Sequence, residues 1–530
     1  MDSIRNFLKR FSELLNNRLF LVLVCFTTGL LSAIPYYFEK LFVFTFISLF
    51  VLFYIVFTQR RANKGVFLPF FVYFFGFYFF VYIFLSELYP YDYFGFTDEQ
   101  GIFIMICSCL LIPLLHSVVE ALVMSFTKFI SNTALFPIGA AAVWVLGEAL
   151  LSVGTLAFPW ANIAVSLTGW LPFLQTASLF GKGFISFIIV FVCSSLAISV
   201  FDKKKVFAFT AVIVLLCNII TGYVLWLIPV EKSTTAETAI VQGNVLFNEK
   251  WNYENQFRIF EKYTEMTEEA ARNGAKLIIL PEGAIPAVFK ENGRIHKAFG
   301  YIAETYDVTV IMGIHYITDT EQRNAVVTIY PDGSLSERYD KLHLVPFSEF
   351  IPFSDFIGKF IPFVEEFSED SGVYQKGDGY KVFQTEFGDI SPLICFDSIF
   401  PNLARESVND GATLLAVVTN DSWFNDSVGI YTHLRHSQLR AIENRRFVVR
   451  GANTGISAFI NQRGEIISET QPLVEDTIYN DVYNIKTISL YTKTGDLVLY
   501  ASVLIVIYIL IDHIRRRKNG KNTIAPDRNL

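Results

Sequence analysis

Residues 391–397 read Ser-Pro-Leu-Ile-Cys-Phe-Asp, a run of strand length that ends at Cys395 and is followed by a carboxylate, Asp397. The other five of the six cysteines lie inside long apolar segments, where a thiol usually behaves as a small inert hydrophobic side chain. A cysteine at the end of a strand, in a polar part of the chain, is a better candidate for a nucleophile. Cys395 and its strand therefore indicate both a fold and a chemistry.

Strands and helices alternate around this run, between residues 230 and 496. Helical stretches fit at 253–273 and 433–446, and the first carries apolar side chains at spacings of three, which is typical of a helix that covers a sheet. Polar residues follow several strand ends, which predicts a layered α/β fold with its site at those ends. Strands are expected at 238–241, 276–280, 308–314, 325–330, 390–394, 414–419, 447–450 and 456–460.

The rest of the chain is too apolar for a water-soluble protein. Hydrophobic residues make up 52% of the 530 residues, and 54 residues are Phe. A helix needs about 20 apolar residues to cross a bilayer. We expect transmembrane helices 1–7 within residues 1–229, an outer domain at 230–496, and a final helix with a basic tail at 497–530. The expected spans are 19–38, 41–58, 66–86, 101–126, 135–157, 173–200, 206–229 and 497–514.

Clusters of Lys and Arg predict how the chain is oriented. They precede the first span, follow the second, fourth and sixth, and follow the last span at 515–518. Positively charged loops stay in the cytoplasm, so the domain at 230–496 is expected on the outer side of the membrane.

The net charge of −7 gives no basic patch of the kind that nucleic acid requires.

A base, a cation and a thiol fall within the outer domain. Glu282 directly follows an apolar strand, where partial desolvation can raise a carboxyl pKa and suit it to general base catalysis. Lys341 and Glu349 share a proline-flanked segment, and a buried lysine can stabilise an oxyanion or lower a thiol pKa. The backbone N–H of Phe396 is a second candidate oxyanion donor. Each residue alone has an ordinary structural interpretation, but together they favour nucleophilic catalysis at Cys395.

Two other groups of polar residues are candidate sites. His433 and His436 form a His-x-x-His pair, but no third ligand is spaced to complete it, so we expect no metal and no cofactor. Glu120 and Glu148 fall within expected membrane spans, where a carboxylate is costly and usually has a partner or a task. Glu148 is expected to order the junction near Trp160.

Longer motifs extend these sites along the chain. They are Val-Gln-Gly-Asn at 241–244, Pro-Glu-Gly-Ala-Ile-Pro at 281–286, Tyr-Asp-Lys-Leu-His-Leu-Val-Pro-Phe-Ser-Glu-Phe-Ile-Pro at 339–352, Ile-Cys-Phe-Asp at 394–397, Thr-Asn-Asp-Ser-Trp-Phe at 419–424, Arg-Ala-Ile-Glu-Asn-Arg-Arg at 440–446 and Ala-Asn-Thr-Gly-Ile-Ser at 452–457. With Trp144, Glu148 and Phe158-Pro159-Trp160 upstream, they resemble the apolipoprotein N-acyltransferases, bacterial membrane enzymes with a nitrilase-like (carbon-nitrogen hydrolase) outer domain. The run from Lys341 to Pro352 is highly specific.

The resemblance implies an α-helical bundle of about eight transmembrane helices plus a nitrilase-like αββα sandwich, in the bacterial inner membrane with the catalytic domain in the periplasm. It implies a triad of Glu282, Lys341 and Cys395, with Glu349 as a second essential carboxylate. Cys395 would take an acyl chain from a membrane phospholipid as a thioester. The α-amine of the diacylglyceryl-cysteine of an apolipoprotein would then accept that chain.

Three positions depart from the pattern of the family, and none belongs to the triad. Phe396 stands where many members have Tyr, Asp397 where Glu is usual, and Ser348 where Gly precedes the second carboxylate. As supporting residues, Phe396 and Asp397 are expected to act beside the nucleophile.

Aromatic segments are candidates for contact with lipid substrates. Trp251 and Trp423, with Glu148 and Trp160, are candidate substrate-binding residues, although packing is an equally good explanation for the tryptophans. The segment 353–364 is too apolar for an ordinary surface loop and is expected to enter the outer leaflet or to form a lid, unless it packs on its own domain.

Two other functions fit part of the pattern. A membrane-tethered nitrilase or amidase would use the same triad but would release its acyl-enzyme to water. A transporter with a ligand-binding outer domain would not need Cys395, although charges within the membrane spans are sparse for a transport path.

Overall fold

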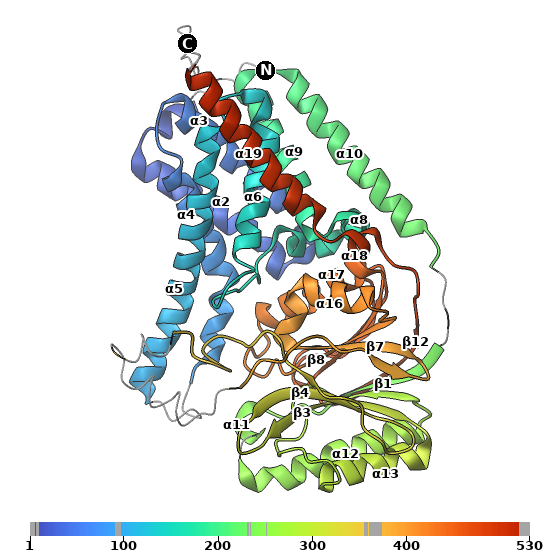
Figure 1. Cartoon of the computed structure of the whole chain (residues 1–530). Helices are drawn as coiled ribbons and strands as arrows, with labels where there is room; N and C mark the ends of the chain where they lie inside the picture. Colours follow the sequence, from blue (N-terminus) through green and yellow to red (C-terminus); the bar gives the residue numbers. More distant parts are fainter. Residues whose placement is uncertain are drawn as a thin grey trace. The chain divides into compact units, whose positions relative to one another are not determined.

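The computed structural model describes residues 6, 10–90, 97–230, 233, 235–250, 252–353, 359 and 374–518 (Figure 1). The chain forms two compact units. One comprises residues 1–153, 158–228 and 496–530, and the other comprises residues 154–157 and 229–495. Trp251 and most of the segment 353–364 lie outside the described residues.

The first unit is a bundle of apolar helices. Within the described part of the chain, seven helices are long and apolar enough to cross a membrane. They are α2 (Arg18–Tyr37), α3 (Val43–Arg61), α5 (Asp98–Met124), α6 (Phe136–Leu150), α9 (Lys182–Asp202), α10 (Lys205–Leu227) and α19 (Leu497–Lys518). A further apolar helix, α4 (Phe67–Val81), has 15 residues and packs against α2 and α5.

Two expected spans differ from the structure because the backbone changes conformation inside an apolar run. Residues 66–86 form α4 and then the 3-10 helix η2 (Ile83–Leu88), so the expected single span is divided. The span expected at 173–200 begins instead at Lys182, after Gly181 with a φ of +78°. The residues before it form the 3-10 helix η6 (Ile163–Trp170) and the short helices α7 (Leu171–Leu174) and α8 (Ala177–Phe180).

The second unit is a four-layer αββα sandwich of two six-stranded sheets. The first sheet has the order β12-β1-β2-β3-β4-β5, and the second has the order β11-β10-β9-β8-β7-β6. In each sheet three neighbouring strands are parallel, β1 to β3 in the first and β7 to β9 in the second. The strands are β1 (Thr235–Gln242), β2 (Leu277–Ile279), β3 (Thr309–Ile317), β4 (Gln322–Ile329), β5 (Tyr339–Asp340), β6 (Phe383–Thr385), β7 (Gly388–Ile394), β8 (Leu414–Thr419), β9 (Phe447–Ala452), β10 (Ala458–Ile460), β11 (Ile466–Glu469) and β12 (Asp476–Tyr483).

Helices cover the outer face of each sheet (Figure 1). On the first sheet lie α12 (Gln256–Arg272) and α13 (Arg294–Tyr306), and on the second lie α16 (Pro401–Asn409) and α17 (Val428–Asn444). The helices expected at 253–273 and 433–446 correspond to α12 and α17. The eight expected strands are present, whereas α13, α16, β5, β6, β11 and β12 were not anticipated.

The core between the sheets joins apolar side chains of both. Ile240, Ile279 and Ile311 of the first sheet belong to one buried cluster with Leu415 and Val417 of the second. Each such side chain contributes roughly 1.5–3 kcal/mol when it leaves water completely. This face-to-face packing holds the ends of β2, β7 and β8 at one edge of the sandwich, and polar side chains follow each of these ends.

Gly313 on β3 gives a test of this close packing. A Cβ added there would lie 2.6 Å from the Cα of Glu282 and 2.7 Å from the backbone N of Gly283. Gly313→Ala is therefore expected to cost about 1–3 kcal/mol of stability and to lower the melting temperature of the purified protein. Gly379→Ala is the matched control, because no heavy atom lies within 4 Å of its added Cβ. Equal melting temperatures for the two variants would contradict this packing.

Candidate active site

Cys395 lies at a sharp turn where the second sheet ends. It directly follows β7 and begins the 3-10 helix η8 (Cys395–Ile399). Its φ is +47°, a left-handed conformation that is unusual for a residue with a side chain. Such a conformation costs on the order of 1–3 kcal/mol and persists only where the surroundings impose it. The turn leaves Cys395 partly exposed while Phe396 and Asp397 are buried.

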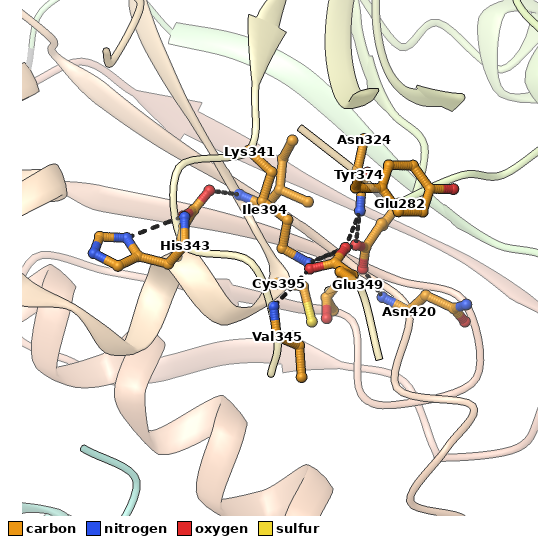
Figure 2. A network of polar contacts seen from close by, with 12 residues as sticks. Glu282, Asn324, Lys341, His343, Val345, Glu349, Tyr374, Ile394, Cys395 and Asn420 are labelled. Atoms are coloured by element: carbon orange, nitrogen blue, oxygen red, sulfur yellow. Dashed lines mark hydrogen bonds and ion pairs between the residues drawn. The ribbon is translucent and has the colours of Figure 1, made fainter. Parts of the chain in front are cut away.

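Lys341 lies between two carboxylates at the same edge. Its Nζ donates to Oε1 of Glu282 at 3.1 Å and to Oε1 of Glu349 at 2.9 Å. Lys341 is 1% exposed and Glu282 is 7% exposed, so these ionic contacts are shielded from water. Figure 2 shows the sulfur of Cys395 beside this group of three side chains.

Both carboxylates are fixed by further donors. The Asn324 amide on β4 bridges them, because its Nδ2 donates to Glu282 Oε1 at 2.6 Å and to Glu349 Oε1 at 2.8 Å. The second oxygen of Glu282 accepts from the backbone N–H of Asn420 at 2.9 Å, and that of Glu349 from the N–H of Val345 at 2.8 Å (Figure 2). The carboxylates are therefore held in place before any substrate arrives.

The electrostatics keep the lysine charged and the thiol protonated. Burial disfavours the ammonium of Lys341, but Glu282 and Glu349 outweigh that effect and raise its pKa well above the ordinary value. Burial raises the pKa of the Glu349 carboxyl, while Lys341 opposes the rise. Burial also raises the pKa of the Cys395 thiol, Glu282 adds to the rise, and Lys341 lowers it. A thiol in this state needs a neighbouring base to become a nucleophile.

Asp397 joins the turn of Cys395 to the segment of Lys341. Its carboxylate is fully buried and accepts from the Tyr339 hydroxyl at 2.8 Å and from the backbone N–H of His343 at 2.7 Å. The His343 ring stacks on Phe400, with ring centroids 3.7 Å apart. Although Asp397 is one methylene shorter than the usual Glu, it reaches across from one sheet's strand end to the other's.

The other candidate substrate-binding residues lie in varied surroundings. Trp423 is partly exposed and contacts Phe247, with ring centroids 4.1 Å apart. In the helical unit, Trp160 is 2% exposed and stacks on Phe158. Glu148, near the end of α6, accepts hydrogen bonds from the indole of Trp144 and from the amide of Asn162. Asn162 directly precedes η6, so Glu148 connects α6 to the start of η6. Substrate contact by these residues stays a prediction.

Three donor groups that metal ions favour converge next to the turn. Ligand atoms of Cys395, Asp421 and His433 lie within 4.8 Å of one another. However, the guanidinium of Arg450 donates to the Asp421 carboxylate at 2.7 Å, and His433 Nδ1 lies 2.8 Å from the same carboxylate. A cation would have to displace Arg450, so this donor set suits a hydrogen-bonded network better than a metal ion.

Several residues of the site escaped sequence reasoning. Asn324 follows Gln322 and Arg323 in β4, and its chain neighbours give no sign that it bridges two carboxylates 42 and 25 residues away. In the sequence, Thr419, Asn420 and Asp421 stand out only as part of the motif at 419–424. Their usable signal is their position at the end of β8, at the same edge as Cys395.

A buried carboxylate, a buried ammonium and a thiol at a strained turn thus form the candidate active site of an α/β sandwich. The carbon-nitrogen hydrolase family model matches residues 237–487, and the apolipoprotein N-acyltransferase N-terminal domain model matches residues 28–195. The chain belongs to the apolipoprotein N-acyltransferase family, and it is a multi-pass inner-membrane protein.

Curated relatives from several bacteria carry the same family name. An apolipoprotein N-acyltransferase of Geobacter metallireducens is 31% identical, over 68% of this chain and 71% of its own length. Apolipoprotein N-acyltransferase 2 of Treponema denticola is 28% identical over 73% of this chain and 78% of its own length. A Vibrio cholerae apolipoprotein N-acyltransferase is 30% identical over 62% and 66%. The match therefore covers parts of both units.

The raised pKa of the Cys395 thiol gives a pH prediction. Because only the thiolate reacts with iodoacetamide, labelling of Cys395 in the folded protein should keep rising about tenfold per pH unit from pH 7 to pH 9. Mass spectrometry of the peptide that contains Cys395 measures the rate. The same peptide in the denatured protein is the control, and its rate should level off near the ordinary thiol pKa of about 8.5. A plateau below pH 8 in the folded protein would contradict the assignment.

Proposed function

We propose that the protein transfers an acyl chain from a membrane phospholipid to the α-amine of the N-terminal diacylglyceryl-cysteine of lipoproteins, through a thioester on Cys395. The observation that carries the proposal is the contact of Lys341 with both Glu282 and Glu349 beside the thiol. Family membership supports lipoproteins and lipids as partners. No cofactor is needed for this chemistry.

The first half-reaction forms the thioester. Glu282 takes the proton of Cys395 as Sγ attacks the ester carbonyl carbon of the phospholipid. The carbonyl oxygen becomes an oxyanion, and Lys341 together with the backbone N–H of Phe396 stabilises it. The C–O bond then breaks, and the proton passes from Glu282 to the alkoxide of the departing lysophospholipid. Atoms and charge balance without another reactant.

The second half-reaction uses the same groups in reverse. The neutral α-amine of the lipoprotein attacks the thioester carbonyl, and Glu282 accepts a proton from the attacking nitrogen. Collapse of the tetrahedral intermediate breaks the C–S bond, and Cys395 regains its proton. A thiolate suits both halves because it is a strong nucleophile and a good leaving group.

Glu349 is assigned a supporting role. It shares the ammonium of Lys341 with Glu282, so Lys341 is held by two contacts that fix the position of Nζ. With Asn324 as the second bridge, a displacement of Glu349 would move both the cation and the base. Hydrogen bonds of this kind preorganise a site, so that little rearrangement is needed during reaction.

Exposure of the thioester to water would waste the acyl chain as a free acid. A membrane-bound enzyme meets both lipid substrates by lateral diffusion. The aromatic segment 353–364, which the sequence predicts to enter the leaflet or to form a lid, lies mostly outside the residues that the structure describes. A membrane-tethered amidase with the same triad would differ in one product, because it would release its acyl group to water.

The thioester can be seen directly by intact mass. Purified protein mixed with phospholipid should gain the mass of one acyl chain, and neutral hydroxylamine should remove it. Cys395→Ala should gain no mass, because the acyl-accepting sulfur is absent, and Glu282→Gln should gain it at least 100-fold more slowly, in the range by which general base catalysis contributes. A folded wild-type protein without an adduct would contradict the proposal. Rapid release of free fatty acid would favour the amidase.

We further propose that the catalytic unit lies on the periplasmic side. Support comes from the basic clusters at the ends of the membrane spans, such as 203–205 and 515–518. The helix α4 with η2 is counted here as a crossing, since about 22 Å of α-helix continues into the 3-10 helix.

This orientation predicts which residues a membrane-impermeant reagent reaches. Tyr253 is 84% exposed in the catalytic unit, and Lys204 is exposed in the basic link between α9 and α10. In intact spheroplasts, Tyr253→Cys should react with an impermeant maleimide, whereas Lys204→Cys should react only after the cells are opened. The reverse pattern would place the catalytic unit in the cytoplasm.

A further inference from the structure

Two buried side chains contact the backbone carbonyl oxygen of Cys395. The hydroxyl of Ser398 donates to it at 2.7 Å, and Nε2 of His433 lies 3.1 Å from it. Ser398 and His433 are at most 1% exposed. Because the left-handed conformation of Cys395 must be imposed by its surroundings, these contacts on its carbonyl fix the turn that aims the thiol.

His433 is in turn fixed by Asp421, which follows β8. The Asp421 carboxylate lies 2.8 Å from Nδ1 of His433 and accepts from Arg450 at 2.7 Å. The hydroxyl of Thr419 also donates to it, at 3.0 Å. Arg450 and His433 lower the pKa of Asp421 despite its complete burial, so this carboxylate is charged.

Thr419 gives Asp421 a second route to Cys395. The sulfur of Cys395 and a carboxylate oxygen of Asp421 lie within 4.8 Å of each other, and the Thr419 hydroxyl, which donates to Asp421, also lowers the pKa of the thiol as a hydrogen-bonding group. Two chains of contacts therefore lead from Asp421 to Cys395. The first, called the Thr419 arm, passes through Thr419 to the sulfur, and the second, called the His433 arm, passes through His433 to the backbone carbonyl of Cys395. The residue between them, Asn420, donates its backbone N–H to the base Glu282.

We propose that Asp421 is a positioning residue for Cys395, which acts through Thr419 on the sulfur and through His433 on the strained backbone. The inference rests on the proposed role of Cys395 as the nucleophile. The last residue of β8, Thr419, and the two residues that follow it thus contact the proposed base, the thiol and the partner of the turn.

The Thr419 hydroxyl has a single proton, which can change partner. Beside the thiol it is donated to Asp421, which keeps Arg450 and His433 as other partners. When Glu282 removes the proton of Cys395, the hydroxyl can rotate and donate to the thiolate instead. The charged or titratable groups around the sulfur include Glu282 and Lys341 from the first sheet, and Asp421, His433 and Arg450 from the second half of the domain.

The Thr419 arm is tested with the full-length protein in detergent. Thr419→Val keeps the shape of the side chain but removes the hydroxyl, whereas Thr419→Ser keeps the hydroxyl. Iodoacetamide labelling of the Cys395 peptide is followed across pH 6–10, with the melting temperature of each variant. We expect Thr419→Val to label about fivefold more slowly at each pH below its plateau, the worth of one hydrogen bond, and Thr419→Ser to stay within twofold of wild type.

The His433 arm has its own matched pair. His433→Gln places an amide N–H near the position of Nε2 and keeps the contact with the Cys395 carbonyl, whereas His433→Asn places one near Nδ1 and keeps the contact with Asp421. Labelling and acyl transfer should fall less in His433→Gln than in His433→Asn at similar melting temperatures. The pair remains decisive if Thr419→Val does not fold.

Each result supports or overturns the inference. It is overturned if Thr419→Val labels at the same rate as wild type, or if Thr419→Ser is as slow as Thr419→Val. It is also overturned if the variants change the melting temperature but leave the labelling rate at each pH unchanged. Labelling needs no acyl donor, so it reports on Asp421 and its arms even if Cys395 forms no acyl adduct. A failure of the proposed function is therefore distinct from a failure of this inference.

Discussion

The arrangement depends on a buried ammonium that two carboxylates share. Lys341 is almost fully enclosed, and a charge in that position is stable only with close partners. Its backbone is tied down as well, because its N–H donates to Asn324 and its carbonyl accepts from Gly377, both at 2.9 Å. Burial and Glu282 raise the pKa of the neighbouring Cys395 thiol, and Lys341 opposes that rise. Glu282 is the proposed acceptor of the thiol proton.

The two sheets divide the chemistry between them. The proposed base follows β2 of the first sheet, whereas the proposed nucleophile follows β7 and the proposed positioning residue Asp421 follows β8 of the second. Neither sheet alone carries a complete site. The buried contacts of Asp397 with Tyr339 and His343 connect the two halves across the sandwich, and the apolar core between the sheets fixes their separation.

How much the sequence predicts depends on the range of the interaction. Cys395, Glu282 and Lys341 were recognisable because each is a chemically distinctive residue beside an apolar strand or between prolines. Asn324 was not, because its role depends on partners far away in the chain. The strand β12 was missed since its burial hardly alternates, and its place is set by pairing with β1. The break at Gly181 was invisible to hydropathy, because the residues on both sides are equally apolar.

The central claim is that the acyl chain rests on Cys395 between two separate half-reactions. Rapid-quench kinetics with phospholipid and no acceptor tests it most directly. We predict a burst of one lysophospholipid per enzyme, matched by an equal amount of acyl-enzyme. When a diacylglyceryl peptide is then added, the acyl-enzyme should disappear at a rate at least equal to overall turnover. Release of lysophospholipid only when the acceptor is present, without an acyl-enzyme, would contradict it.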